Sequence, residues 1–192
     1  IRNLLSGMGA MALILGLGGC KTPAPEVPAA SGFLTTYRDM EQVDDVTWLR
    51  EAPGNRIVRY KKFIINPVKI KVQEFEGQPV RPEGAQEASD YMRAALTKAL
   101  SDKYPVVSEP GADVAEIRVA VTDAYRKKSR VGMAMEAEIV DSYSGVPAAA
   151  VVTAAMDELV YGKKWAGTGV KSLMDKWAAG FRNALDEAQD ED

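Results

Sequence analysis

Hydrophobic and polar residues alternate with a period of two in four stretches of the chain, and this period predicts β-strands. The first stretch is Tyr60–Val72, in which Val68, Ile70 and Val72 alternate with lysines. Pro67 cannot donate a hydrogen bond to a sheet, so we expect an edge position or a bulge there. The other three stretches have these hydrophobic faces: Ile117, Val119 and Val121; Val131, Met133, Met135, Ala137 and Ile139; and the alanine-rich Val146–Leu159, which follows a Ser144-Gly145 turn.

Two further stretches repeat their apolar positions every three or four residues, which predicts amphipathic helices. The first is Pro82–Tyr104, where Pro82 suits the first helical turn and Pro105 ends the helix. The second begins at Val170, with Thr168 as its cap, and we expect it to fray from about Asp186. The apolar stripes consist of Tyr91, Met92, Ala95, Leu96, Ala99 and Leu100 in the first helix, and of Val170, Leu173, Met174, Trp177, Phe181 and Leu185 in the second.

The order of these elements predicts an α+β fold. The order is a strand, a helix, an optional short strand at Pro105-Val106-Val107, three strands and a final helix. This order is typical of a two-layer sandwich with a mostly antiparallel sheet and two main helices on one face. The stretch Ser31–Arg50 has neither period. We expect it to be irregular, with one helical turn, and to pack over the domain through Phe33, Leu34, Tyr37, Trp48 and Leu49.

The first twenty residues are typical of an export signal. Arg2 gives a small basic region, and the uncharged stretch Met8–Leu17 is too short and too rich in glycine for a membrane span. It ends in Leu17-Gly18-Gly19-Cys20, which resembles the cleavage box of bacterial lipoproteins. In such a box the small residues enter the peptidase site and the cysteine sulfur carries the lipid. An ordinary signal peptide followed by a free thiol is the alternative.

These features divide the chain into four parts. We expect a lipoprotein signal peptide over residues 1–19, a lipidated cysteine and Pro-rich tether over 20–30, one periplasmic α+β domain over 31–187, and a frayed acidic tail over 188–192. Lys21 stands where an aspartate would retain such a lipoprotein in the inner membrane. We therefore expect attachment to the outer membrane, with the domain facing the periplasm.

Composition removes several kinds of site. The chain has no histidine and one cysteine, which excludes Ser-His-Asp and Cys-His catalysis in their usual forms, disulfides, and His-based zinc sites. There is no phosphate loop and no EF-hand calcium loop. We expect no cofactor and no metal. The net charge of −3 does not favour nucleic-acid binding.

Two groups of charged residues remain as candidates for chemistry or binding. Glu136 and Glu138 share one strand face, and Asp123 and Asp141 lie near strand ends. Paired carboxylates could hydrolyse a glycan across a cleft, but a solvated sheet face, or cross-strand pairs with Arg118, is the interpretation that we favour. The other group is a candidate contact loop for anionic lipid or an acidic partner, although a soluble hairpin explains it too: Arg126, Lys127, Lys128, Ser129 and Arg130.

Other residues have structural interpretations. Lys61, Lys62, Lys69 and Lys71 are typical of the protection of an exposed sheet edge, where a partner strand could also add. Trp165 and Trp177 are expected in the core or in helix packing.

Several segments together resemble the bacterial lipoprotein family called domain of unknown function 3313: "SGFLTTYRDM", "YKKFIINPVKI", "YPVVSEPGADVAEIRVAVTDA", "EAEIVDSYSGVPAAAV" and "KWAAGFRNALDE". The resemblance covers about residues 31–187. It implies an exported, lipid-anchored bacterial protein, and it brings no catalytic residues that could be carried over to this chain.

Taken together, the sequence favours a non-enzymatic binding or scaffolding module that is held to the membrane by lipid on Cys20 and has a protein partner in the envelope. One alternative is a carrier of lipids or small hydrophobic molecules, because eight methionines could line an adaptable pocket. The other is a hydrolase that uses Glu136 and Glu138.

Overall fold

The computed structural model describes residues 30–54, 56–127, 130–158 and 168–190. A seven-stranded sheet is built from β1 (Glu41–Asp44), β2 (Thr47–Glu51), β3 (Lys62–Ile65), β4 (Lys69–Ile70), β7 (Val114–Lys127), β8 (Arg130–Asp141) and β9 (Pro147–Glu158). Its order is β1-β2-β9-β8-β7-β3, and β4 also pairs with β7. The remaining elements are the 3-10 helix η1 (Arg56–Arg59), a small β5–β6 ribbon (Glu74–Phe75 and Gln78–Pro79), α1 (Pro82–Leu100) and α2 (Thr168–Asp190).

The long antiparallel strands β7, β8 and β9 form the centre of the sheet, as their alternating pattern predicts. Ile117 lies opposite Ile139, and Ile139 lies opposite Ala149. Gly145, with a φ of 67°, occupies the turn between β8 and β9 in a backbone conformation that glycine adopts without steric cost. Among the strands that the structure describes, β3 and β4 pair in parallel, both with β7. The sheet is therefore mostly antiparallel, as expected.

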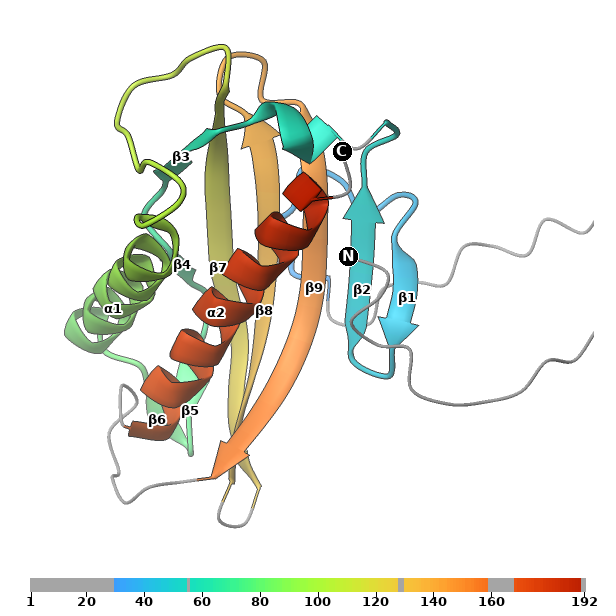
Figure 1. The fold of residues 1–192 in the computed structure, drawn as a ribbon. Helices are drawn as coiled ribbons and strands as arrows, with labels where there is room; N and C mark the ends of the chain where they lie inside the picture. Colours follow the sequence, from blue (N-terminus) through green and yellow to red (C-terminus); the bar gives the residue numbers. More distant parts are fainter. Residues whose placement is uncertain (1–29, 55, 128–129, 159–167, 191–192) are drawn as a thin grey trace, which may run out of the picture.

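Both helices lie on the same face of this sheet, side by side (Figure 1). The hydroxyl of Tyr91 on α1 bonds to Asp175 on α2 at 2.9 Å, and Lys171 pairs with Glu87 at 3.0 Å. The main core fills the space between the helices and the sheet, where the predicted apolar stripes meet the predicted strand faces; its fully buried members include Met92, Leu96, Leu100, Ile117, Met133, Leu173, Met174 and Leu185. These observations confirm the two-layer α+β sandwich.

The predicted single strand Tyr60–Val72 is divided into β3 and β4 by Asn66 and Pro67. Proline cannot donate to the ladder, and the chain continues on β7 only after it. The predicted alternation holds, because Val68 and Val72 are buried while the lysines between them are exposed. The Pro105–Val107 stretch makes only an isolated bridge, between Val106 and Phe63.

The segment Ser31–Arg50 is not irregular throughout, as we had expected. Its second half forms the hairpin of β1 and β2, and β2 pairs antiparallel with β9. β2 is only five residues long, and Trp48 is its one buried residue. The strand is therefore too short to show an alternation of buried and exposed residues in the sequence. The hairpin widens the sheet by two strands.

Helix ends also differ from the prediction. α1 stops at Leu100 instead of Tyr104, since a turn closed by the Tyr104 N–H on the Leu100 carbonyl places the Tyr104 ring edge-on against Phe63 at 5.7 Å. α2 begins at Thr168, two residues early, and continues to Asp190. The helix thus continues past Asp186, where we had expected fraying to begin. Tertiary contacts offset the unfavourable dipole there, since Tyr104 donates to Asp186 and Ala188 is buried.

Candidate functional site

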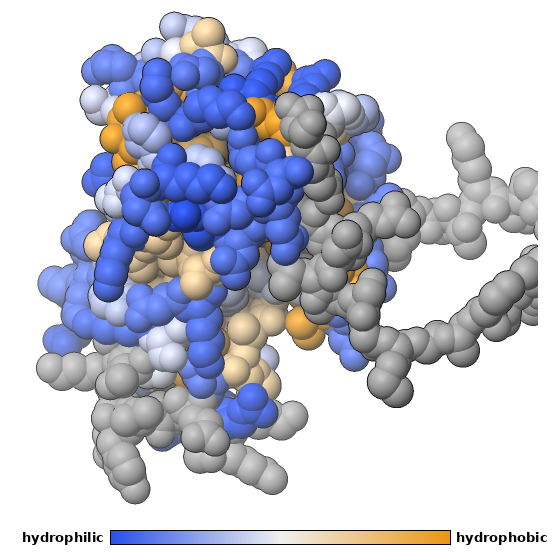
Figure 2. All heavy atoms as spheres, viewed as in Figure 1, coloured by the Kyte–Doolittle hydropathy of each residue, from blue (hydrophilic) through white to orange (hydrophobic). Residues whose placement is uncertain are grey.

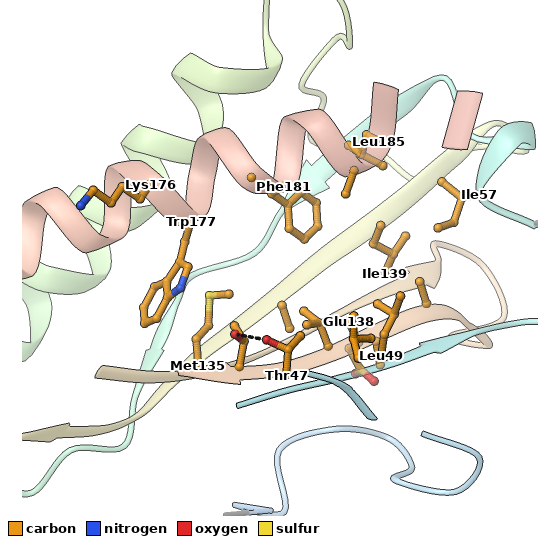
Figure 3. Close-up of a pocket in the computed structure, with 18 residues that line it drawn as sticks. Thr47, Leu49, Ile57, Met135, Glu138, Ile139, Lys176, Trp177, Phe181 and Leu185 are labelled. Carbon is orange, nitrogen blue, oxygen red and sulfur yellow. Dashed lines mark hydrogen bonds between the residues drawn. The ribbon is translucent and has the colours of Figure 1, made fainter. Parts of the chain in front are cut away.

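An apolar pocket of about 280 Å³ lies between α2 and the sheet (Figure 3). We call it the α2 pocket. Its floor comes from β2, β8 and β9, its roof from one face of α2, and its end from Ile57 of η1. The lining includes Thr47, Leu49, Ile57, Met135, Ala137, Ile139, Val151, Thr153, Lys176, Trp177, Gly180, Phe181, Ala184 and Leu185.

Helical spacing places the roof residues together. Trp177, Gly180, Phe181 and Ala184 are three or four positions apart, so they occupy one side of α2. In Figure 3 the Trp177 and Phe181 rings extend from the helix toward the sheet, where Met135 and Thr47 lie below them. Two aromatic rings thus alternate with the two smallest side chains along the same helical face.

The pocket exists because the sheet is wider than its helical layer. In Figure 1 neither helix crosses in front of β1 or β2. Thr47 and Leu49 of β2 face the helical side, yet no third helix among the described residues covers them. Figure 2 shows the same side of the molecule, on which hydrophilic side chains dominate and hydrophobic ones appear in separate patches. The pocket is therefore an apolar recess in a mostly polar surface.

Polar groups are few in the pocket, and most have a partner. Thr47 and Thr153 bond to each other through their hydroxyls at 3.0 Å. Lys176, with 62% of its side chain exposed, donates to the Asp157 carboxylate at 2.8 Å, and Ser172 donates to the same oxygen at 2.6 Å. Glu138 belongs to the wall, but its carboxylate lies on the opposite face of the sheet.

That opposite face carries the two carboxylates that the sequence singles out. Glu136 is completely buried and Glu138 is 3% exposed, so the expectation of a solvated sheet face is wrong. The residues that cover them are Ser31–Tyr37, which we call the N-terminal segment. Its apolar side chains form a second core with β2 and β9, made of Phe33, Leu34, Tyr37, Met40, Trp48, Ala150 and Val152.

Both carboxylates bind the N-terminal segment. Glu136 accepts hydrogen bonds from the Ser31 N–H at 2.6 Å and from the Tyr37 hydroxyl at 2.5 Å. Glu138 accepts from the Thr35 N–H at 2.9 Å and from its hydroxyl at 3.0 Å. Burial, followed by the bond to Glu136, raises the pKa of Tyr37. A buried carboxylate is tolerated when its oxygens are bonded in this way.

Cations next to the N-terminal segment balance these charges. Arg118 lies opposite Glu138 in the β7–β8 register and approaches its carboxylate to 3.6 Å, which confirms the expected cross-strand pair. Lys71 donates to the Ser31 carbonyl at 2.6 Å, and Lys69 lies over the Phe33 ring at 5.5 Å. The structure thus fastens the N-terminal segment with two carboxylates and two lysines.

The β3 edge is not exposed, contrary to expectation. Phe63 donates its N–H to Pro105 and accepts from the Val107 N–H, so the Pro105–Val107 stretch covers that edge. Lys61 bonds to Gln189 at 2.5 Å, and Lys62 pairs with Asp113 at 3.1 Å. No strand can add to this covered part of β3.

The candidate contact loop Arg126–Arg130 joins β7 to β8, as the soluble-hairpin interpretation predicts. Arg126 pairs with Glu76 at 2.5 Å, and Arg130 is exposed. Lys128, Ser129 and the side chain of Lys127 lie outside the described residues. Neither Arg126 nor Arg130 lines the α2 pocket. A contact role for this loop stays a prediction.

Asp141 ends β8, as expected, whereas Asp123 is exposed at an irregularity within β7. Hydrogen bonds, first from the Ser144 N–H and then from the Ser144 and Tyr60 hydroxyls, hold the pKa of Asp141 at about 2. Asp141 therefore fixes the β8–β9 turn and lies away from the lining of the pocket.

Several predicted sites lie outside the described residues: the signal peptide 1–19, the cleavage box Leu17, Gly18 and Gly19, the lipid acceptor Cys20, and Trp165. Within the described part of the chain, neither helix combines the length and apolar character that crossing a bilayer requires. In the same part, no three His, Cys, Asp or Glu side chains are grouped so as to hold a metal ion.

Sequence reasoning did not find the α2 pocket. It assigned Trp177 to helix packing, which is confirmed, since Trp177 is half-buried against the main core. The available signal was Gly180, a glycine in the middle of a helical apolar stripe, because glycine there destabilises a helix unless space is needed.

Solved structures that are similar to this chain include the following three. PelC from Paraburkholderia phytofirmans, solved as a dodecamer, is 14% identical, with 72% of this chain and 96% of PelC covered and a TM-score of 0.44. XCC0632 from Xanthomonas campestris, a DUF330 protein, is 12% identical, with 68% of this chain and 87% of XCC0632 covered and a TM-score of 0.48. Lipoprotein GNA1162 from Neisseria meningitidis is 12% identical, with 66% of this chain and 98% of GNA1162 covered and a TM-score of 0.38. All three TM-scores lie below 0.5, which marks a loose likeness.

No curated protein matches the chain. The family model of DUF3313, described as protein of unknown function, matches residues 29–134. This region contains the N-terminal segment, α1, β7 and the first part of β8. The chain therefore belongs to the DUF3313 family.

Proposed function

We propose that this protein is a lipid-anchored, non-enzymatic binding module of the bacterial envelope, and that the α2 pocket is its binding site. The observation that carries the proposal is the pocket itself, an apolar recess between α2 and the uncovered strand β2. Apolar recesses with few polar groups are the usual form of binding sites. An apolar group of an envelope partner is the occupant that this lining favours.

The N-terminal residues support the membrane anchor. Leu17-Gly18-Gly19-Cys20 has the form of a lipoprotein cleavage box, and Lys21 favours the outer membrane. The tether of residues 21–30 contains three prolines. Directly after it, Ser31 and Thr35 are bonded to buried carboxylates. The domain would thus operate close to the bilayer surface, on its periplasmic side.

The placement of the carboxylates weakens the hydrolase alternative. Glu136 and Glu138 were its candidate acid and base, and a glycosidase needs such a pair across a cleft. Here both carboxylates are buried and bonded to the N-terminal segment. A reaction that used them would first have to remove that segment.

A carrier of a small hydrophobic molecule is the second candidate. The size of the pocket favours it, because about 280 Å³ is close to the lower end of small-molecule sites, which is about 300 Å³. Met135 on the floor adds an adaptable apolar wall. A protein partner and a small molecule would use the same residues, and the mass of what is captured separates them.

Photo-crosslinking in cells tests the binding site. Benzoylphenylalanine replaces Phe181, which lines the pocket, in one strain, and Tyr143, which is 71% exposed at the β8–β9 turn, in another. We expect one dominant adduct from position 181 and none from position 143. Equal adducts from both positions, or none from position 181, would contradict the proposal.

A further inference from the structure

We propose that the α2 pocket binds a single acyl chain that ends in a carboxylate, with the chain between α2 and the sheet and the head group at Lys176. This inference rests on the α2 pocket as the binding site of the proposed function, and it specifies the ligand of the second candidate, a carrier of a small hydrophobic molecule. It joins three observations: the size of the pocket, the glycine in its roof, and Lys176, the one cation among the described residues that line it.

The first observation is size. A volume of about 280 Å³ accommodates a small apolar body. It leaves no room for the two chains of a phospholipid or for a bulky helix of a partner. The lining runs along α2 from Lys176 to Leu185 and along β2 from Thr47 to Leu49. A flexible single chain fits such a lining.

The second observation is Gly180. A glycine in a helix interior is about 1 kcal/mol less favourable than alanine. A Cβ atom added at Gly180 would meet no atom within 4 Å, so crowding does not require glycine at this position. Ala184, one turn further, is the other small residue of the roof. Glycine at this position therefore makes the helix less stable than alanine would, and it leaves open space in the roof beside Trp177 and Phe181.

The third observation is charge. The described lining contains two charged residues, Lys176 and Glu138. The Glu138 carboxylate is bonded on the other face of the sheet, so Lys176 alone of the two has its charged group on the helical side. Its ammonium group has three donors, of which Asp157 accepts one at 2.8 Å. The Asp157 oxygen also accepts from Ser172, which compensates its charge further. Within the described part of the chain, two donors of this exposed lysine thus remain for an anionic head group at the mouth of the pocket.

The test titrates the purified domain with laurate below its micelle concentration, with dodecyltrimethylammonium as the cationic counterpart and phosphatidylglycerol vesicles as the two-chain counterpart. We expect laurate to bind with one molecule per chain, and more tightly than the cation. Gly180→Leu fills the roof and should weaken laurate binding about tenfold, the loss of roughly two buried methylene groups. Ala179→Leu adds the same side chain at an exposed neighbouring position outside the lining and should leave binding unchanged.

Two further variants test the head group. Lys176→Met should weaken laurate binding by about threefold, as expected for an exposed ion pair, and Lys176→Arg should retain it. Folding does not confuse the main comparison, because Gly180→Leu improves helix propensity and should not lower the Tm.

Equal binding of the cation and laurate, or equal laurate binding by Gly180→Leu and the wild type, would overturn the inference. Binding of vesicles without binding of laurate would also overturn it and would indicate a membrane surface instead. If laurate fails while position 181 still crosslinks a protein in cells, the acyl-chain inference fails and the proposed binding module stands. If both fail, the proposed function fails as well.

Discussion

The hydroxyl of Tyr37 donates a hydrogen bond of 2.5 Å to Oε2 of Glu136, a residue with no exposed surface, across 99 positions of sequence. The same hydroxyl accepts from the N–H groups of Phe33 and Leu34 at 2.9 and 3.3 Å. One side chain therefore closes the turn of the N-terminal segment and attaches that turn to the centre of β8. The Ser31 N–H, which lies closer to the tether, bonds to the other oxygen of the same carboxylate at 2.6 Å.

Tyr37→Phe should destabilise the fold by about 1–3 kcal/mol, the usual effect of leaving a buried acceptor without its donor. The loss falls on Glu136, whose second oxygen keeps only the Ser31 N–H. Chemical denaturation measures it. Tyr143→Phe is the matched control, because Tyr143 is 71% exposed, and it should change stability by less than about 0.5 kcal/mol. Equal stability of the two variants would mean that the Tyr37 bond contributes nothing.

Glu138→Gln should loosen the N-terminal segment without unfolding the sheet. The new amide group would face either the Thr35 N–H or the Arg118 guanidinium, and both of these are donors. We expect faster hydrogen exchange at the Thr35 amide, while exchange at Ile117 and Ile139 in the sheet is unchanged. Glu83→Gln, at an exposed position in the first turn of α1, is the control. Unchanged exchange at Thr35 would contradict the role given to Glu138.

Acid should destabilise the fold through Asp141. Its pKa is 3.8 in the unfolded chain and about 2 in the folded one, so the ionised form favours folding. That stabilisation is fully present above the unfolded value and is lost as the pH falls toward about 2. Asp141→Asn should lower the stability at neutral pH and flatten its pH dependence in this window. If the stability of Asp141→Asn changed with pH as that of the wild type does in this window, groups other than Asp141 would be responsible for the acid destabilisation.

Cys20→Ser should release the protein from the membrane fraction. The lipid chains on the cysteine would anchor the mature protein, since each buried CH₂ contributes about 0.8 kcal/mol and several chains act together. Fractionation of cells that express either form measures this, and metabolic labelling with a fatty acid shows the acylation itself. If both forms sediment with the membrane, the cleavage box is not the anchor.

The sequence predicts the main layers of this fold because its long elements have clear periods. The stripes of α1 and α2 and the alternation in β7 and β8 lie in the main core as expected. The short strands β1 and β2 were missed, since their own pattern is too brief and β9, the strand that joins β2 to the rest of the sheet, is about a hundred positions away. Local periodicity reports which face is buried, and it does not report what covers it.

The same limit explains the candidate site. Glu136 and Glu138 stand out in the sequence as polar residues of one strand face, but only the tertiary structure shows that the N-terminal segment covers them. The α2 pocket depends on the hairpin of β1 and β2 extending past α2, which no single segment predicts. Gly180 was its one local sign.

Native mass spectrometry of the protein released from its own cell envelope is the most direct test of the account. The comparison is between the wild type, Gly180→Leu, which fills the pocket, and Ala179→Leu, which does not. We predict a bound mass on the wild type and on Ala179→Leu, and a bare chain for Gly180→Leu. A bare wild-type chain, or the same bound mass on all three proteins, would contradict the α2 pocket as the binding site.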